Sequence, residues 1–86
     1  MHNPINYVEV SKVVSEAIYN KYKIVVYFVL RFDAESLDKQ IYCHWPDLDI
    51  NAPILTIPNM WTSDQYYEAV NTIYNAFLDA YVEELV

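Results

Sequence analysis

The sequence predicts an α+β fold in which a helix, three strands of an antiparallel sheet and a second helix follow one another. Apolar residues recur at helical spacing near both ends of the chain, and a β-branched and aromatic stretch lies between them. With 86 residues, of which 55% are hydrophobic, the chain is long enough for one core. We therefore expect a single domain over 1–86 whose sheet is packed by two helices.

The first helix is predicted over about 4–20. Asn3 is a candidate N-cap and Pro4 suits the first helical position, where its missing N–H is not needed. Six apolar side chains then fall on one side of a helix: Tyr7, Val10, Val13, Val14, Ala17 and Ile18.

Three strands are predicted over 21–33, 39–45 and 54–57. In the first strand, apolar residues on one face alternate with a second face that is polar at its ends. The strand is rich in Ile, Val, Tyr and Phe, which is typical of a central strand. Its even-numbered face is apolar and is expected to meet the core: Tyr22, Ile24, Val26, Phe28, Leu30 and Phe32. The third strand is bounded by Pro53 and Pro58, which suits the edge of a sheet.

The second helix is predicted over about 63–85. Thr62 and Gln65 have the spacing of a capping box. The apolar arc of this helix spans roughly 200°, which is wider than one packing surface requires. Acidic residues form a strip along the remaining face, and three of them stand near the C-terminal end, where the helix dipole disfavours anions: Asp79, Glu83 and Glu84.

The charges of the chain are divided unevenly. Residues 1–39 contain five Lys or Arg and five acids, so they sum to zero. Residues 40–86 contain no Lys or Arg and hold the whole net charge of −7. Such a surface attracts basic partners and repels nucleic acid and anionic membranes. We predict that these acids bind a partner: Asp47, Asp49, Asp64, Glu68, Asp79, Glu83 and Glu84.

Candidate catalytic and metal chemistry is sparse. Because the chain has no glycine, phosphate-binding loops and the nucleophile elbow are excluded. Cys43 and His44 are adjacent on a strand and point to opposite faces, so they cannot grip one ion together. Residues 47–51 resemble the start of a calcium loop, but Ala52 and Pro58 stand where it needs glycine and a bidentate acid. We expect no enzyme, no cofactor and no metal.

Aromatic residues offer a second kind of binding surface, because tyrosine is over-used at protein interfaces. Tyr67, Tyr74 and Tyr81 repeat every seven residues on the second helix. Only two helices are available to cover two sheet faces, so the face opposite the core is expected to stay open, with Val25, Val29 and His44 on it. The predicted aromatic residues for partner binding or dimerisation are Tyr27, Tyr42, Tyr67, Tyr74 and Tyr81.

The order of elements resembles that of double-stranded RNA-binding domains, although their lysine-rich second helix has no counterpart here. In profile, the chain is similar to small acidic inhibitors encoded by phages and mobile elements, including anti-CRISPR and anti-restriction proteins. That resemblance implies a nucleic-acid mimic that binds a basic, nucleic-acid-binding protein.

Two alternatives stay open, namely an immunity protein or antitoxin against a basic toxin, and a homodimeric structural or accessory protein whose charge serves solubility. One cysteine and no apolar run longer than the seven residues 24–30 favour a cytoplasmic protein, in the host cell if a virus encodes it.

Overall fold

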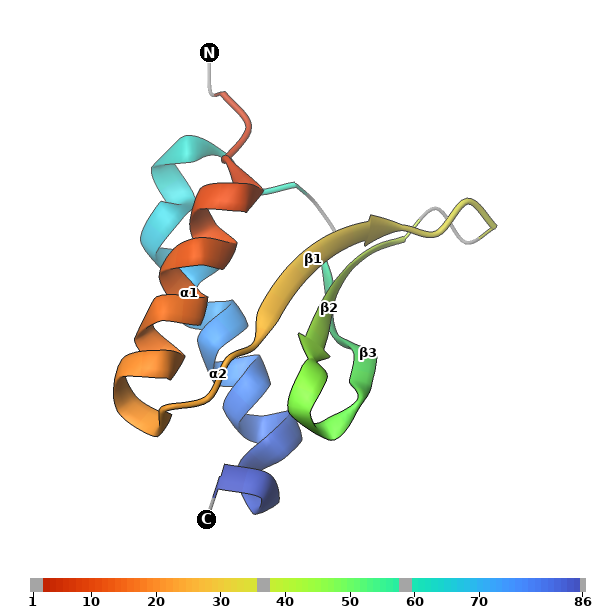
Figure 1. Cartoon of the computed structure of the whole chain (residues 1–86). Helices are drawn as coiled ribbons and strands as arrows, with labels where there is room; N and C mark the ends of the chain where they lie inside the picture. Colours follow the sequence, from red (N-terminus) through yellow and green to blue (C-terminus); the bar gives the residue numbers. More distant parts are fainter. Residues whose placement is uncertain (1–2, 36–37, 58–59, 86) are drawn as a thin grey trace.

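A computed structural model describes residues 3–35, 38–57 and 60–85 (Figure 1). Helix α1 (Tyr7–Tyr22) is followed by strands β1 (Tyr27–Phe32), β2 (Lys39–Trp45) and β3 (Ile50–Ile57), and then by helix α2 (Tyr66–Leu85). The strands form one antiparallel sheet in the order β1-β2-β3. The predicted α+β fold is therefore confirmed in its element order, its sheet and its two helices.

Helix α1 begins later than predicted. Its N-cap is Asn6, whose Oδ1 accepts hydrogen bonds from the N–H groups of Val8 and Glu9 at 3.1 and 3.2 Å. The segment before it is extended and pairs with the chain ahead of α2, where the Ile5 N–H donates to the Trp61 carbonyl at 3.1 Å. The prediction of a helix start at Asn3 and Pro4 was wrong, because this tertiary pairing holds both residues outside the helix.

Strand β1 also begins later than the predicted 21–33. Helix α1 continues to Tyr22, and Lys23 caps it in the left-handed conformation (φ 59°) with its N–H on the Tyr19 carbonyl at 2.8 Å. Regular pairing starts only at Tyr27, opposite His44. The prediction that this strand is central was also wrong, because β2 lies between β1 and β3.

Strand β3 is longer than the predicted 54–57. After β2, the residues Pro46–Leu48 form one 3-10 turn, which Asp49 ends in the left-handed conformation (φ 54°). The sequence predicts no strand between β2 and Ile54, but pairing with β2 already resumes at Ile50. Pro53 therefore lies inside β3, and a bulge interrupts the register at Ile41/Tyr42. The prediction of an edge position is confirmed.

Helix α2 is preceded by the capping box that the sequence predicts, but it begins at Tyr66 and not at about 63, and it is kinked near its end. The Thr62 N–H donates to Gln65 Oε1 at 3.0 Å in a capping box, ahead of a 3-10 turn over Ser63–Gln65. Tyr81 departs from helical geometry (φ −128°, ψ 27°), so the last turn is offset from the rest of α2. Within the described ranges, neither helix is both long and apolar enough to cross a bilayer.

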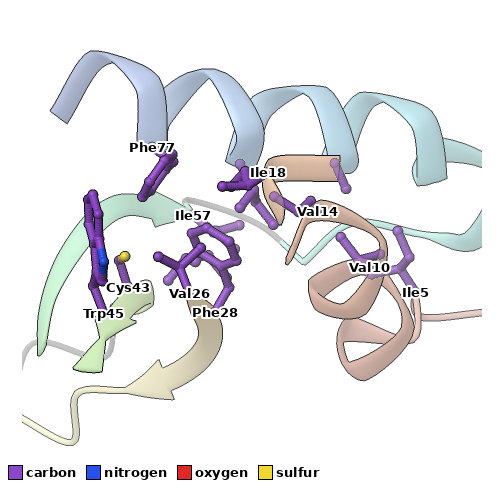
Figure 2. Packing of buried hydrophobic residues seen from close by; sticks show 13 residues of the cluster. Ile5, Val10, Val14, Ile18, Val26, Phe28, Cys43, Trp45, Ile57 and Phe77 are labelled. Carbon is purple, nitrogen blue, oxygen red and sulfur yellow. The ribbon is translucent and has the colours of Figure 1, made fainter. Parts of the chain in front are cut away.

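The core lies between the two helices and one face of the sheet (Figures 1 and 2). Phe77 of α2 is the largest fully buried side chain of the described residues, with its ring centroid 5.8 Å from that of Phe28 and 5.7 Å from that of Trp45. Phe32, which was predicted to face this core, is 59% exposed. It lies on the helix-side face of β1, but toward the hairpin tip, where Figure 1 shows the sheet extending beyond the helices.

Candidate protein-binding surfaces

Five of the seven predicted acids gather at one end of the molecule. Trp45 ends β2 and contacts Tyr81 of α2, with ring centroids 6.0 Å apart. This contact brings the turn between β2 and β3 beside the C-terminal end of α2, as Figure 1 shows. All five carboxylates are exposed, and we call them the acidic end: Asp47, Asp49, Asp79, Glu83 and Glu84.

The other two predicted acids, Asp64 and Glu68, lie at the start of α2. Both are exposed, and Glu68 Oε2 accepts a hydrogen bond from Gln65 Nε2 at 3.2 Å. Glu68 and Glu83 are fifteen residues apart, which corresponds to about 22 Å along a helix. The structure therefore divides the predicted acidic surface into the acidic end and a separate pair at the helix start.

The basic residues lie on other elements. Lys12 and Lys21 are on α1, Lys23 caps it, Arg31 is on β1 and Lys39 begins β2. Helix α1 packs against β1, whereas α2 packs against β3 and α1. The molecule is thus polarised, with a mixed-charge side around α1 and β1 and a purely acidic side along α2 and the β2–β3 turn.

The face of the sheet opposite the helices is open, as predicted. Tyr27 is 51% exposed, and its ring stacks on that of His44 at 6.3 Å. The Arg31 guanidinium lies 5.0 Å from the centroid of the half-buried Tyr42 ring, which is a cation–π contact. Val29 is 45% exposed between these two pairs. This face offers apolar and aromatic surface that no element of the described chain covers.

The tyrosines of α2 differ from one another. Tyr67 is 80% exposed, whereas Tyr74 is half-buried. Tyr81 packs on Trp45 and Phe77 within the molecule. Burial raises the pKa of Tyr81, and proximity to Cys43 and Glu84 raises it further. The seven-residue repeat therefore does not form one continuous exposed stripe, and partner binding by these tyrosines stays a prediction.

A groove of about 540 Å³ lies between the outer flank of α1 and the beginning of β1. Small residues of α1, Ser11 and Ser15, line it together with Lys12 and Glu16. Four of its apolar lining residues are at least 44% exposed: Val8, Tyr19, Val25 and Tyr27. The groove adjoins an edge of the sheet, because among the described strands β1 pairs only with β2.

Sequence reasoning missed this groove. Val8, Ser11, Ser15 and Tyr19 recur at intervals of three and four residues, so they share one side of a helix. These residues lie outside the apolar side predicted for this helix, and no role was predicted for them. The sequence indicates a hollow on this side of the helix, because the large Val8 and Tyr19 flank two small serines. It does not indicate that this side lies next to β1.

Cys43 and His44 lie on opposite sides of β2. Cys43 is fully buried, and burial raises the pKa of its thiol to about 12, so it stays protonated at neutral pH. His44 is exposed on the open face. In the part of the chain that the structure describes, no three His, Cys, Asp or Glu side chains cluster as metal ligands. Comparison with family models, curated proteins and solved structures finds no match to this chain.

Proposed function

We propose that this chain is a small inhibitor that binds another protein through its acidic end and occupies a surface where that protein would bind nucleic acid. The observation that carries the proposal is the gathering of five exposed carboxylates from two distant parts of the sequence. No Lys or Arg occurs anywhere in residues 40–86 to neutralise them. A field of one sign steers an oppositely charged partner and speeds the encounter.

The end of α2 supports the proposal because local stability disfavours it. The last turn of a helix is negative, and anions there cost free energy where cations would contribute it. Glu83 and Glu84 both stand in that turn and both are exposed, so neither is needed for packing. A local conflict of this kind is expected where a surface serves binding.

The surface is suited to proteins that bind nucleic acid because such proteins carry clustered Lys and Arg for phosphate contacts. Carboxylates replace phosphates as charged hydrogen-bond acceptors for the same side chains. The same acidic end would also capture a basic toxin. The two kinds of partner are distinguished by competition, because duplex DNA would compete with the chain for a nucleic-acid-binding protein but not for the toxin.

Capture from native cell extract, followed by mass spectrometry, tests the proposal with two matched variants. One carries Glu83→Lys and Glu84→Lys in the acidic end, and the other carries Glu9→Lys and Glu16→Lys on α1. Both change the net charge by the same amount. We expect the first variant to lose the captured protein and the second to keep it, because only the first places like charges across the interface. Equal loss, or equal retention, would contradict the proposal.

The salt dependence of capture gives an independent readout. An interface dominated by charge weakens steeply as ionic strength rises, because exposed charges are screened within about 10 Å at 0.1 M salt. We expect the captured protein to be basic, and its retention to fall between low and high salt. Retention that does not change with salt would point instead to the aromatic surfaces.

A further inference from the structure

The two edges of the sheet are unequally protected against pairing with another strand. The β3 edge carries Pro53, which has no N–H to donate, and a bulge faces it at Ile41/Tyr42. The β1 edge, Tyr27–Phe32, has neither proline nor bulge and only one charged residue, Arg31. An exposed regular edge of this kind is a template for a further strand.

The layers of the molecule leave room for such a strand. Two packed helices, each about 10 Å across, form a layer about 20 Å wide. Three strands at a spacing of about 4.8 Å form a sheet about 15 Å wide. The flank of α1 next to β1 therefore overhangs the sheet, and the groove of about 540 Å³ lies beneath it. A fourth strand beside β1 would lie under this flank and fill the groove.

Strand β1 carries an exposed apolar side chain, Phe32, that suits the groove of a second copy. Phe32 is 59% exposed on the helix-side face, where its own helices do not reach it. When two copies pair antiparallel about a two-fold axis at Val29, position 32 of one strand stands opposite position 26 of the other. Val26 directly precedes β1 and is a buried residue in the lining of the groove, so Phe32 of the second copy would lie against the groove. Each copy thus presents one apolar side chain and one apolar groove on the same edge.

Charge complementarity supports the same register. Basic side chains stand before β1, at Lys21 and Lys23, and acidic ones follow it, at Asp33 and Glu35. A two-fold axis brings the basic end of one strand to the acidic end of the other. Position 31 then faces position 27, which sets the guanidinium of the partner's Arg31 beside the exposed Tyr27 ring.

We propose that this chain forms a homodimer in which β1 pairs antiparallel with β1 of a second copy, joining the two sheets into one of six strands. This goes beyond the proposed inhibition, because it uses the mixed-charge side of the molecule and none of the acidic end. Both acidic ends stay exposed in the dimer, so one dimer presents two of them. A closed two-fold pairing also removes both β1 edges, which open-ended strand addition would not.

Sedimentation velocity of the full chain over a dilution series tests the dimer. We expect a monomer–dimer equilibrium that Phe32→Lys shifts to monomer by about tenfold or more, because the lysine cannot enter an apolar groove. Tyr67→Lys makes the same charge change on α2, where the sequence predicts a competing dimer surface, and we expect it to leave the equilibrium unchanged. Circular dichroism should show both variants folded, because neither side chain is buried in the monomer.

Cross-linking tests the register independently. Val29→Cys places two thiols together on the two-fold axis, and we expect oxidation to yield a disulfide-linked dimer. Tyr67→Cys should not cross-link, and the buried, protonated Cys43 contributes none of the signal. The proposal is overturned if the wild-type chain sediments as a monomer at every concentration. It is equally overturned if Phe32→Lys and Tyr67→Lys act alike, or if Val29→Cys fails to cross-link.

Discussion

Replacing Glu83 and Glu84 together by Lys should stabilise the fold, although it removes two residues of the proposed binding surface. Both side chains are exposed in the last turn of α2, after the kink at Tyr81, so no packing is lost. A favourable charge in the last turn is worth about 0.3–1 kcal/mol, and the effect does not extend to Asp79 before the kink. The pair should therefore raise the free energy of unfolding by about 0.6–2 kcal/mol.

Thermal denaturation followed by circular dichroism measures this change. For a domain of this size, 1 kcal/mol shifts Tm by about 4–8 °C, so we expect a rise of about 2–16 °C. The α1 variant, Glu9→Lys with Glu16→Lys, should not gain, because Glu9 stands in the first turn of its helix, where an anion is favoured. A fall in Tm for the Glu83 and Glu84 variant would refute the dipole argument. A rise with unchanged partner affinity would refute the binding role of these acids.

Three further predictions concern the core and the caps. Phe77→Ala should lower the free energy of unfolding by about 3–5 kcal/mol in urea, because the residue is fully buried against other rings; a loss below about 1 kcal/mol would contradict the packing. Asn6→Ala should lower the free energy of unfolding by about 1 kcal/mol in the same assay, because it removes the N-cap of α1. An unchanged free energy of unfolding would contradict the capping role. Burial raises the pKa of Cys43 from 9.0 to about 12, so its contribution to stability is complete below pH 9 and is lost as pH rises toward 12. Between these values the loss approaches about 1.4 kcal/mol per pH unit, and Cys43→Ala should flatten that slope in denaturant titrations at stepped pH.

The elements that local chemistry specifies were predicted well. Helix α2 has a capping box and a long apolar period, both of which act within a few residues of one another. The capping box at Thr62 was therefore predictable, whereas the 3-10 turn between it and Tyr66 was not. The kink at Tyr81 was not, because no proline or glycine marks it. Tyr81 packs on Trp45, which is 36 residues earlier in the chain, so the geometry there involves a contact that periodicity does not contain.

The beginnings of α1 and β1 were missed for a related reason. Asn3 and Asn6 are both acceptable N-caps, and the pairing of Pro4 with Thr62 decides between them. Lys23 ends α1 in a left-handed conformation that glycine usually adopts, and nothing in its identity signals this. The β-branched residues that follow then look like strand, although regular pairing begins only at Tyr27.

The candidate surfaces were also predictable only in part, where they depend on local sequence and not on tertiary contacts. That all seven acids are exposed was predictable, because ionised side chains are rarely buried. Their separation into the acidic end and the pair at Asp64 and Glu68 depends on the contact between Trp45 and Tyr81. The groove between α1 and β1 depends on where a helix lies relative to a sheet edge, and that is decided by packing across the whole core.

Competition between this chain and duplex DNA for the captured partner tests the proposed inhibition most directly. The purified partner is titrated with labelled duplex DNA in the presence and absence of the chain, and the apparent DNA affinity is measured. The proposed function predicts mutual exclusion, in which increasing amounts of the chain weaken DNA binding in proportion and the Glu83→Lys, Glu84→Lys variant has no effect. A ternary complex of partner, DNA and chain, formed with unchanged DNA affinity, would contradict it.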